Sequence, residues 1–195
     1  MITKLKYGNT NTFFIRGIHG GLLVDTDYAG TLPAFYRAIK EKNIRLSDIS
    51  HVMATHCHPD HMGLISELMK QNIRLLLPDI QEPYIHFSDE IFAREKRLNY
   101  QPINRKDAVI IRLDESRTFL KNMGIMGEII LTPSHSKDSV SLILDSGECF
   151  VGDLEPMEYL DGYGHNESLQ NDWQLITSHS PKIIYYAHAN QKILK

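Results

Sequence analysis

Four side chains able to bind a metal lie within six residues of one another: His56, His58, Asp60 and His61. Imidazole and carboxylate are ligands well suited to Zn²⁺, and to iron or manganese in related sites. The preceding residues 51–55 are typical of a short strand. In an extended turn His56 and His58 point the same way, whereas Asp60 and His61 begin a helix and face a second point. This spacing predicts a cluster that serves two metals.

Three further ligand-type residues each follow an apolar stretch with strand character. They are His135, Asp153 and His188, which come after residues 127–131, 149–151 and 183–186. Sheet folds often place functional side chains in the loops at strand ends. Taken singly, each of the three is more typical of a surface residue. Together with the first cluster they give seven candidate ligands, a number that suits two adjacent metals.

The elements expected to position these side chains alternate between strands and helices. Apolar residues Leu32, Phe35, Tyr36 and Ile39 have helical spacing, with Thr31 as the expected N-cap and Pro33 in the first turn. Further helices are predicted after residue 61, around 80–98 and at 171–178. Strands are predicted at 12–16, 22–25, 51–55, 73–77, 108–112, 118–120, 127–131, 140–144, 149–151 and 183–186, the first two forming a hairpin. This order suits two packed sheets with helices outside.

Composition narrows the class of protein. The chain has 195 residues, 21 Lys and Arg against 24 Asp and Glu, and a formal charge of −3, so it lacks the strongly basic field of a nucleic-acid-binding protein. Two cysteines argue against a disulfide scaffold, and Cys57 is expected to pack away from the ligands beside it. No stretch reads as a signal peptide or a membrane span. We expect one domain over residues 1–195, a cytoplasmic location, a small-molecule substrate, and neither nucleic-acid nor membrane partners; the oligomeric state stays open.

The motifs and their order resemble the metallo-β-lactamase superfamily over nearly the whole chain. Residues 56–61 match its H-x-H-x-D-H signature, and residues 132–135 are similar to its T-P-G-H. Gly152-Asp153 matches its Gly-Asp, residues 187–189 stand where G-H-G is usual, and residues 23–26 resemble its L-I-D-T. The resemblance implies an α+β fold, an αββα four-layer sandwich of two mixed β-sheets with helices outside.

The same resemblance implies a ligand assignment. The first metal would be held by His56, His58 and His135, and the second by Asp60, His61 and His188, with Asp153 bridging the two. The expected cofactors are two zinc ions, with iron or manganese as alternatives. Asp25 is expected to accept a hydrogen bond from a ligand histidine, as outer carboxylates at metal sites do.

These residues predict a metal-dependent hydrolase that uses a hydroxide bound by two metals to cleave a small ester, thioester, lactone or similar substrate. Asp60 and Asp153 are the expected catalytic residues, because both lie where they can position the hydroxide. One alternative is a mononuclear iron oxidoreductase of the same fold, similar to the persulfide dioxygenases. Another is a non-catalytic metal-binding regulatory protein, against which the intact ligand set argues.

Two segments are long enough to contact a substrate. Residues 154–168 leave the site directly after Asp153, and within them Tyr159, Tyr163 and His165 are the expected substrate contacts. The alternative is the segment 79–106, with its aromatic and basic side chains. Only seven residues follow His188 (195 − 188 = 7), so the helical substrate domain typical of glyoxalase II enzymes is not expected.

Overall fold

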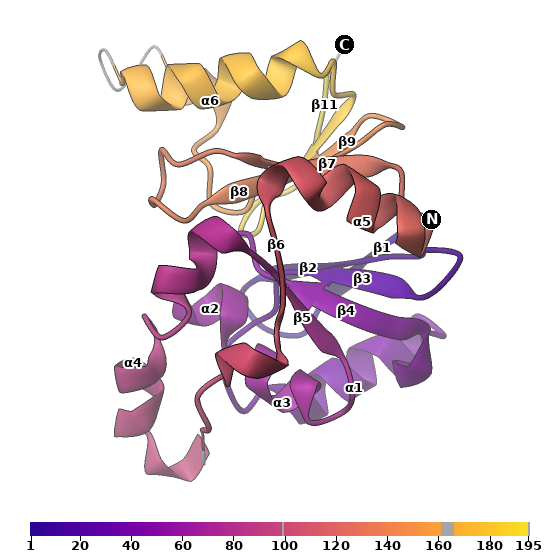
Figure 1. Cartoon of the computed structure of the whole chain (residues 1–195), viewed down its shortest axis with the longest axis vertical. Coiled ribbons are helices and arrows are strands. Elements are labelled where there is room, and N and C mark those ends of the chain that lie inside the picture. The colour runs from indigo at the N-terminus through magenta and orange to yellow at the C-terminus, as the bar shows by residue number, and fades with distance from the viewer. Residues whose placement is uncertain (99, 161–165, 195) are drawn as a thin grey trace.

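The computed structural model describes residues 1–98, 100–160 and 166–194. Two mixed β-sheets pack face to face with helices outside them, which confirms the predicted αββα sandwich (Figure 1). The first sheet has the order β1 (Ile2–Lys6), β2 (Asn11–Ile15), β3 (Gly21–Val24), β4 (Ile49–Met53), β5 (Arg74–Pro78) and β6 (Val109–Ile111). The strands β1 to β3 pair antiparallel, and β3 to β6 pair parallel.

The second sheet has the order β11 (Lys192–Ile193), β10 (Ile183–Tyr185), β9 (Glu148–Phe150), β8 (Val140–Leu144) and β7 (Gly127–Leu131). Strand β8 is antiparallel to both β7 and β9, and β10 is parallel to β9. The strands β7, β9 and β10 therefore run in the same direction. Their carboxyl ends reach the same edge of the sheet, and His135, Asp153 and His188 follow these three ends.

The helices connect the strands and cover the sheets. They are α1 (Leu32–Glu41), α2 (Pro59–Met62), α3 (Ile65–Met69), α4 (Asp89–Arg94), α5 (Ser116–Met123) and α6 (Glu167–Ser178). Short 3₁₀ turns occupy Leu46–Asp48, Asp79–Tyr84, Lys96–Leu98, Arg105–Asp107, Leu113–Glu115 and Met157–Tyr159. Within the described residues, no helix is long and apolar enough to cross a membrane.

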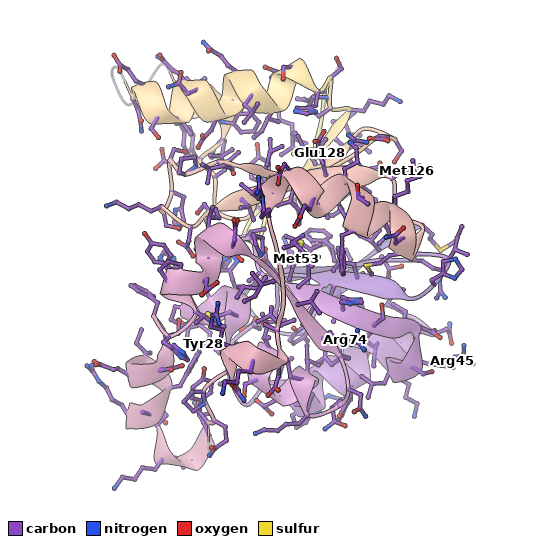
Figure 2. All side chains as sticks on the ribbon, viewed as in Figure 1. Tyr28, Arg45, Met53, Arg74, Met126 and Glu128 are labelled. Carbon is purple, nitrogen blue, oxygen red and sulfur yellow. The ribbon has the colours of Figure 1, made fainter. Side chains whose placement is uncertain are left out.

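Buried apolar side chains form three clusters, one for each interface between layers. The first lies between the first sheet and α1 and α3, and includes Phe35 and Leu68. The second lies between the two sheets and includes Met53, which is fully buried at the centre of the molecule, whereas Arg45 extends from its edge (Figure 2). The third joins the second sheet to α6 through Trp173. Burial of these faces is the main contribution that holds the four layers together.

One predicted strand is wrong. Residues 118–120 belong to α5 and not to a strand. The buried side chains of this helix, Ser116, Leu120 and Met123, have helical spacing, and Gly124 ends it in the left-handed conformation with φ 79°. The segment 118–120 is too short for its apolar pattern to distinguish a strand from a helix. Leu120 and Met123 pack into the cluster between the sheets, beside β7.

Smaller differences concern the chain ends and one helix cap. Strands β1 and β11 were not expected, and both are edge strands paired on one side. Thr31 is the N-cap residue of α1, as predicted, but only its backbone takes part: its carbonyl accepts from the N–H groups of Ala34 and Phe35, whereas its hydroxyl donates to the Tyr28 carbonyl. Helix α6 starts at Glu167, earlier than predicted, where the Asn166 side chain accepts from the Leu169 N–H.

Candidate metal centre

The first cluster of candidate ligands lies at the carboxyl end of β4. The chain leaves the sheet after Met53, turns through residues 54–58 and enters α2 at Pro59, which suits the first turn of a helix. His58 has extended backbone at the start of this helix. The histidines on the turn and those on the helix therefore approach one region from two directions.

The structure brings all seven predicted side chains together. They form three overlapping groups whose ligand atoms lie within 4.8 Å of one another: His56, His58 and His135; His56, His61 and Asp153; and Asp60, His61 and His188. His56 and His61 each belong to two groups. Groups that overlap in this way leave room for neighbouring metal positions, and the expectation of two metals stays a prediction.

Asp153 has a central position among these groups. Its Oδ1 atom lies 3.3 Å from the Nε2 atoms of both His61 and His188, and its Oδ2 atom lies 3.9 Å from His135 Nε2. At the second position, His188 Nε2 is also 3.1 Å from Asp60 Oδ2. At the first position, His135 Nε2 lies 3.3 Å from His58 Nδ1. The Asp153 carboxylate thus lies near imidazoles from both of the predicted ligand sets, and its bridging role stays a prediction.

Three of these ligand atoms are buried without a hydrogen bond: Nε2 of His56, Nε2 of His61 and Oδ1 of Asp153. A buried polar atom without a partner costs free energy, so such atoms in a folded protein need an explanation. All three belong to residues of the donor groups described above. A divalent cation with nitrogen and oxygen ligands would satisfy them, so the residues present fit a metal of the zinc type.

The charges around the site favour a cation. Burial, with the neighbouring imidazoles of His61 and His58, holds the pKa of His56 well below its usual range. Burial also acts to lower the pKa of His61, but the carboxylates of Asp25 and Asp153 outweigh it and raise this pKa to about 10. The pKa of His56 favours a neutral imidazole donor, whereas the carboxylates beside His61 favour a positive charge at that place, which a divalent metal would supply instead of the proton.

The carboxylate of Asp25 contacts the outer nitrogen of the His61 ring, in the supporting role predicted for it. Its Oδ2 atom lies 3.3 Å from Nδ1 of His61, on the opposite side of the ring from the buried Nε2 atom. Its Oδ1 atom accepts hydrogen bonds from the N–H and hydroxyl of Thr55 at 2.7 and 2.9 Å. Asp25 follows β3 in the left-handed conformation, with φ 59°. This pattern fixes the orientation of a ligand histidine through its outer nitrogen.

The sequence did not indicate a second set of supporting residues. The buried Gln81 amide donates to the carbonyl oxygens of Ala54, Thr55 and Asp138. The Asp138 carboxylate accepts from the N–H of Cys57 at 2.7 Å. These bonds tie the turn 54–58 to the loop that carries His135. Nothing in the local sequence distinguishes these residues from surface polar residues, because their role arises only when the two sheets meet.

Cys57 lies between two candidate ligands but takes no part in the cluster. Its side chain is 2% exposed and belongs to the core between the first sheet and its helices. Burial raises the pKa of its thiol well above the usual range. A buried thiol that stays protonated is a packing residue and not a nucleophile, in agreement with the prediction.

Several cavities adjoin the candidate metal centre, among them one of about 120 Å³ that is lined in part by His135 and Asn166. One of about 330 Å³ is lined by His135, Asp153 and His188 together with residues 154–156 and 186. A smaller one of about 100 Å³ lies against His58 and is lined in part by Tyr84. A larger cavity of about 530 Å³ lies elsewhere, between α3 and residues 101–107, and none of the seven residues lines it.

The two segments predicted to contact substrate thus both reach the site. Residues 154–156 line the larger adjoining cavity, whereas Tyr159 is 49% exposed and does not line it. Tyr163 and His165 lie outside the described residues. The segment 79–106 contributes Tyr84 and Phe87 to the smaller cavity. The choice among Tyr159, Tyr163 and His165 as substrate contacts stays a prediction.

A two-sheet sandwich with a histidine and aspartate cluster at one edge defines a class of metal-binding hydrolase folds. The model of the metallo-beta-lactamase superfamily matches residues 5–188 of this chain, and the chain belongs to that superfamily. Members of this superfamily bind divalent metals, and the donor groups described above are candidate sites for them. The prediction of the family from its motifs is therefore confirmed.

Individual relatives agree with this placement. A probable metallo-hydrolase of Methanocaldococcus jannaschii is 30% identical over 75% of this chain and 68% of its own length. An atrochrysone carboxyl ACP thioesterase of Claviceps purpurea is 28% identical over 77% of this chain, but over only 41% of its own length. The chain thus spans less than half the length of the fungal relatives it matches.

A solved structure shows the same fold. The metallo-beta-lactamase family protein from Thermus thermophilus superposes with a TM-score of 0.71 and 19% identity, covering 98% of this chain and 74% of that protein. At this identity the likeness supports the fold alone.

Proposed function

We propose that this protein is a binuclear metallohydrolase that cleaves a small ester, thioester, lactone or similar substrate, with zinc as the metal. The observation that carries the proposal is the set of three overlapping donor groups with three buried, unpartnered ligand atoms. A protein that bound metal only for stability would gain nothing from a site that opens into a cavity of about 330 Å³. Structural zinc sites are closed by protein ligands, whereas catalytic sites keep an open position.

Each residue then has a defined role. His56, His58 and His135 would hold the first ion, Asp60, His61 and His188 the second, and Asp153 would contact both. Divalent ions bound there would lower the pKa of a shared water and polarise a carbonyl group of the substrate. Asp60 and Asp153 would accept hydrogen bonds from the attacking water and orient it toward the substrate. Asp60 is 24% exposed at its side chain and can pass a proton to solvent.

A thioester is the first substrate class to test. Relatives that match three quarters of this chain are named thioesterases, although they are longer proteins. Thioesters and activated esters share a carbonyl centre attacked by hydroxide, so one site can accept both. The choice between acyl groups depends on the cavities and not on the metals.

The test combines metal content with activity. The protein would be loaded with zinc, with iron(II) and with manganese in turn, and assayed against thioesters, esters and lactones with small acyl groups. We expect hydrolysis by the zinc-loaded protein, and loss of both metal and activity in His58→Ala. Oxygen consumption on a persulfide with the iron-loaded protein, without hydrolysis of any member of the panel, would support the oxidoreductase alternative instead.

A further inference from the structure

A small cavity beside the candidate metal centre has features that the hydrolytic chemistry does not use. It measures about 100 Å³ and lies against the His58 imidazole. Tyr84 and Phe87 form part of its wall, and the loop 136–138 forms another part. The Phe87 N–H donates to the Tyr84 carbonyl at 2.8 Å, and this tight turn brings both rings to the same cavity.

The surface of the cavity is mainly apolar, and three of its lining residues, His58, Tyr84 and Phe87, carry rings. The Phe87 ring lies 5.5 Å from the His58 ring, centroid to centroid, with 32° between their planes. The buried carboxylate of Asp138 is already engaged, because its two oxygens accept from the Cys57 N–H and the Ser136 hydroxyl. Phe87 is 57% exposed and belongs to none of the three buried apolar clusters, which is unusual for a phenylalanine. An exposed aromatic ring beside a metal centre suits contact with a ligand.

A positive charge lies at the same cavity. Lys137 is an exposed side chain of the lining and makes no ion pair within residues 1–98, 100–160 and 166–194. The ammonium is therefore available to an anion that enters from the solvent. Ring surface and a free cation together are complementary to a planar apolar group that carries a negative charge.

We infer that this cavity is a subsite for an aromatic ring bearing a carboxylate, with Phe87 and Tyr84 holding the ring and Lys137 the carboxylate. The inference rests on the proposed function, since it places this group next to a carbonyl at the metals. Engineered apolar cavities of about 150 Å³ hold a benzene ring, so this partly open cavity of about 100 Å³ takes at most one ring, part of which stays in the opening. Larger fused rings would project into solvent.

Direct binding tests this subsite without requiring turnover. Dissociation constants of acetate, phenylacetate and 4-carboxyphenylacetate would be measured by calorimetry on the zinc-loaded protein. We expect phenylacetate to bind at least about fivefold more tightly than acetate, the effect of one ring contact. We expect the second carboxylate to add about threefold, the effect of an exposed ion pair. The same ligands with Phe87→Ala and Lys137→Met separate the two contributions.

Each variant has a matched control from the same kind of environment. Ile91→Ala removes an exposed apolar side chain from α4, 43% exposed and outside the cavity, and Lys121→Met removes an exposed ammonium from α5. Phe87→Ala should abolish the gain from the ring, and Lys137→Met the gain from the second carboxylate. Neither control should change either gain.

The outcomes separate this inference from the proposed function. Equal dissociation constants for acetate and phenylacetate, or a ring gain that survives in Phe87→Ala, would overturn the subsite. A carboxylate gain that is absent or survives in Lys137→Met would overturn the role of Lys137. Aromatic binding through Phe87 without hydrolysis of any ester or thioester would support the subsite and remove the proposed hydrolase. Hydrolysis of small acetyl thioesters, together with equal dissociation constants for acetate and phenylacetate, would support the hydrolase and remove the subsite.

Discussion

Asp25 links the backbone of the first sheet to a candidate metal ligand. Its carboxylate is fixed by the N–H and the hydroxyl of Thr55 and lies 3.3 Å from His61 Nδ1. Its φ of 59° costs free energy for any residue with a β-carbon, although aspartate and asparagine tolerate it best. The strained backbone and the contact with the histidine occur at the same residue, which is typical of a functional position.

The first prediction follows from this geometry. Asp25→Asn keeps the size and the tolerance of the left-handed backbone but removes the charge that faces His61. We expect zinc affinity to fall by about 10- to 100-fold, as it does when outer-shell partners of ligand histidines are changed. A competition titration with a chromogenic chelator measures this. Asp27→Asn is the control, because Asp27 is equally buried but contacts the N–H groups of Thr10 and Tyr28. Equal zinc affinity in both variants would contradict the role of Asp25.

The second prediction concerns Asp60, whose Oδ2 atom lies 3.1 Å from His188 Nε2. Asp60→Asn keeps the shape of the side chain but removes its basicity. We expect kcat to fall by at least about 10²-fold, the usual scale for a group that moves or positions a proton. The remaining donors should retain metal, so elemental analysis accompanies the rate. Asp79→Asn, at an exposed carboxylate outside the cluster, is the control. Turnover near the wild-type value with full metal content would refute the assignment.

The sequence predicted the local part of this site better than the parts that depend on tertiary packing. His56, His58, Asp60 and His61 are neighbours in the chain, so their spacing alone indicates a shared function. His135, Asp153 and His188 required the assumption that three strands end at one edge, which the parallel directions of β7, β9 and β10 satisfy. Gln81 and Asp138 carry no local signal, and Phe87 was indicated only as one of the aromatic residues of the segment 79–106. Their positions are set by the meeting of the two sheets.

At the scale of elements, the corner after β9 decides where Asp153 points. Gly152 forms this corner with φ 59°, and its N-terminal neighbour Val151 donates its N–H to the Tyr185 carbonyl of β10. A β-carbon at Gly152 would lie 2.3 Å from the Thr55 hydroxyl oxygen, the same group that holds Asp25. The corner therefore places the second sheet against Thr55, the residue that holds Asp25 beside the first cluster of candidate ligands.

The third prediction tests this contact with Gly152→Ala. We expect a loss of about 1–3 kcal/mol in the free energy of unfolding from the backbone strain alone, and weaker zinc binding because Thr55 must move. Urea denaturation and the chelator titration measure the two effects. Gly147→Ala is a matched control, since Gly147 has φ 105° but its added β-carbon would meet only the flexible Lys182 side chain. The control should lose stability and keep zinc affinity. Equal affinity in both variants would contradict the argument.

The elements that the sequence did not predict have two physical causes. Strands β1 and β11 lie at sheet edges, where only one side is paired and the apolar pattern is weak. The segment predicted as a strand at 118–120 forms α5, because packing beside β7 favours a helix that buries Leu120 and Met123. Central strands such as β3, β5 and β8 combine a strong apolar pattern with burial on both faces, and the sequence indicated all three.

At the scale of the whole molecule, the candidate metal centre joins the two halves of the chain. His56, His58, Asp60 and His61 follow a strand of the first sheet, whereas His135, Asp153 and His188 follow strands of the second. Each of the three donor groups contains residues from both halves. Metal binding at either position therefore requires the two sheets to be packed together, and the unfolded chain offers no such site.

The fourth prediction follows from this linkage. A ligand that binds only the folded state stabilises it by about 4 kcal/mol at a concentration 1,000 times its Kd. For a chain of this size 1 kcal/mol corresponds to about 2–4 °C in Tm, so zinc should raise Tm by about 10 °C over the chelated protein.

Calorimetry and elemental analysis of the same samples should give two zinc ions per chain. His188→Ala should retain one ion and part of the shift, because the group of His56, His58 and His135 remains complete. One ion per wild-type chain at saturating zinc, or a Tm that zinc does not change, would contradict a binuclear centre shared by both sheets.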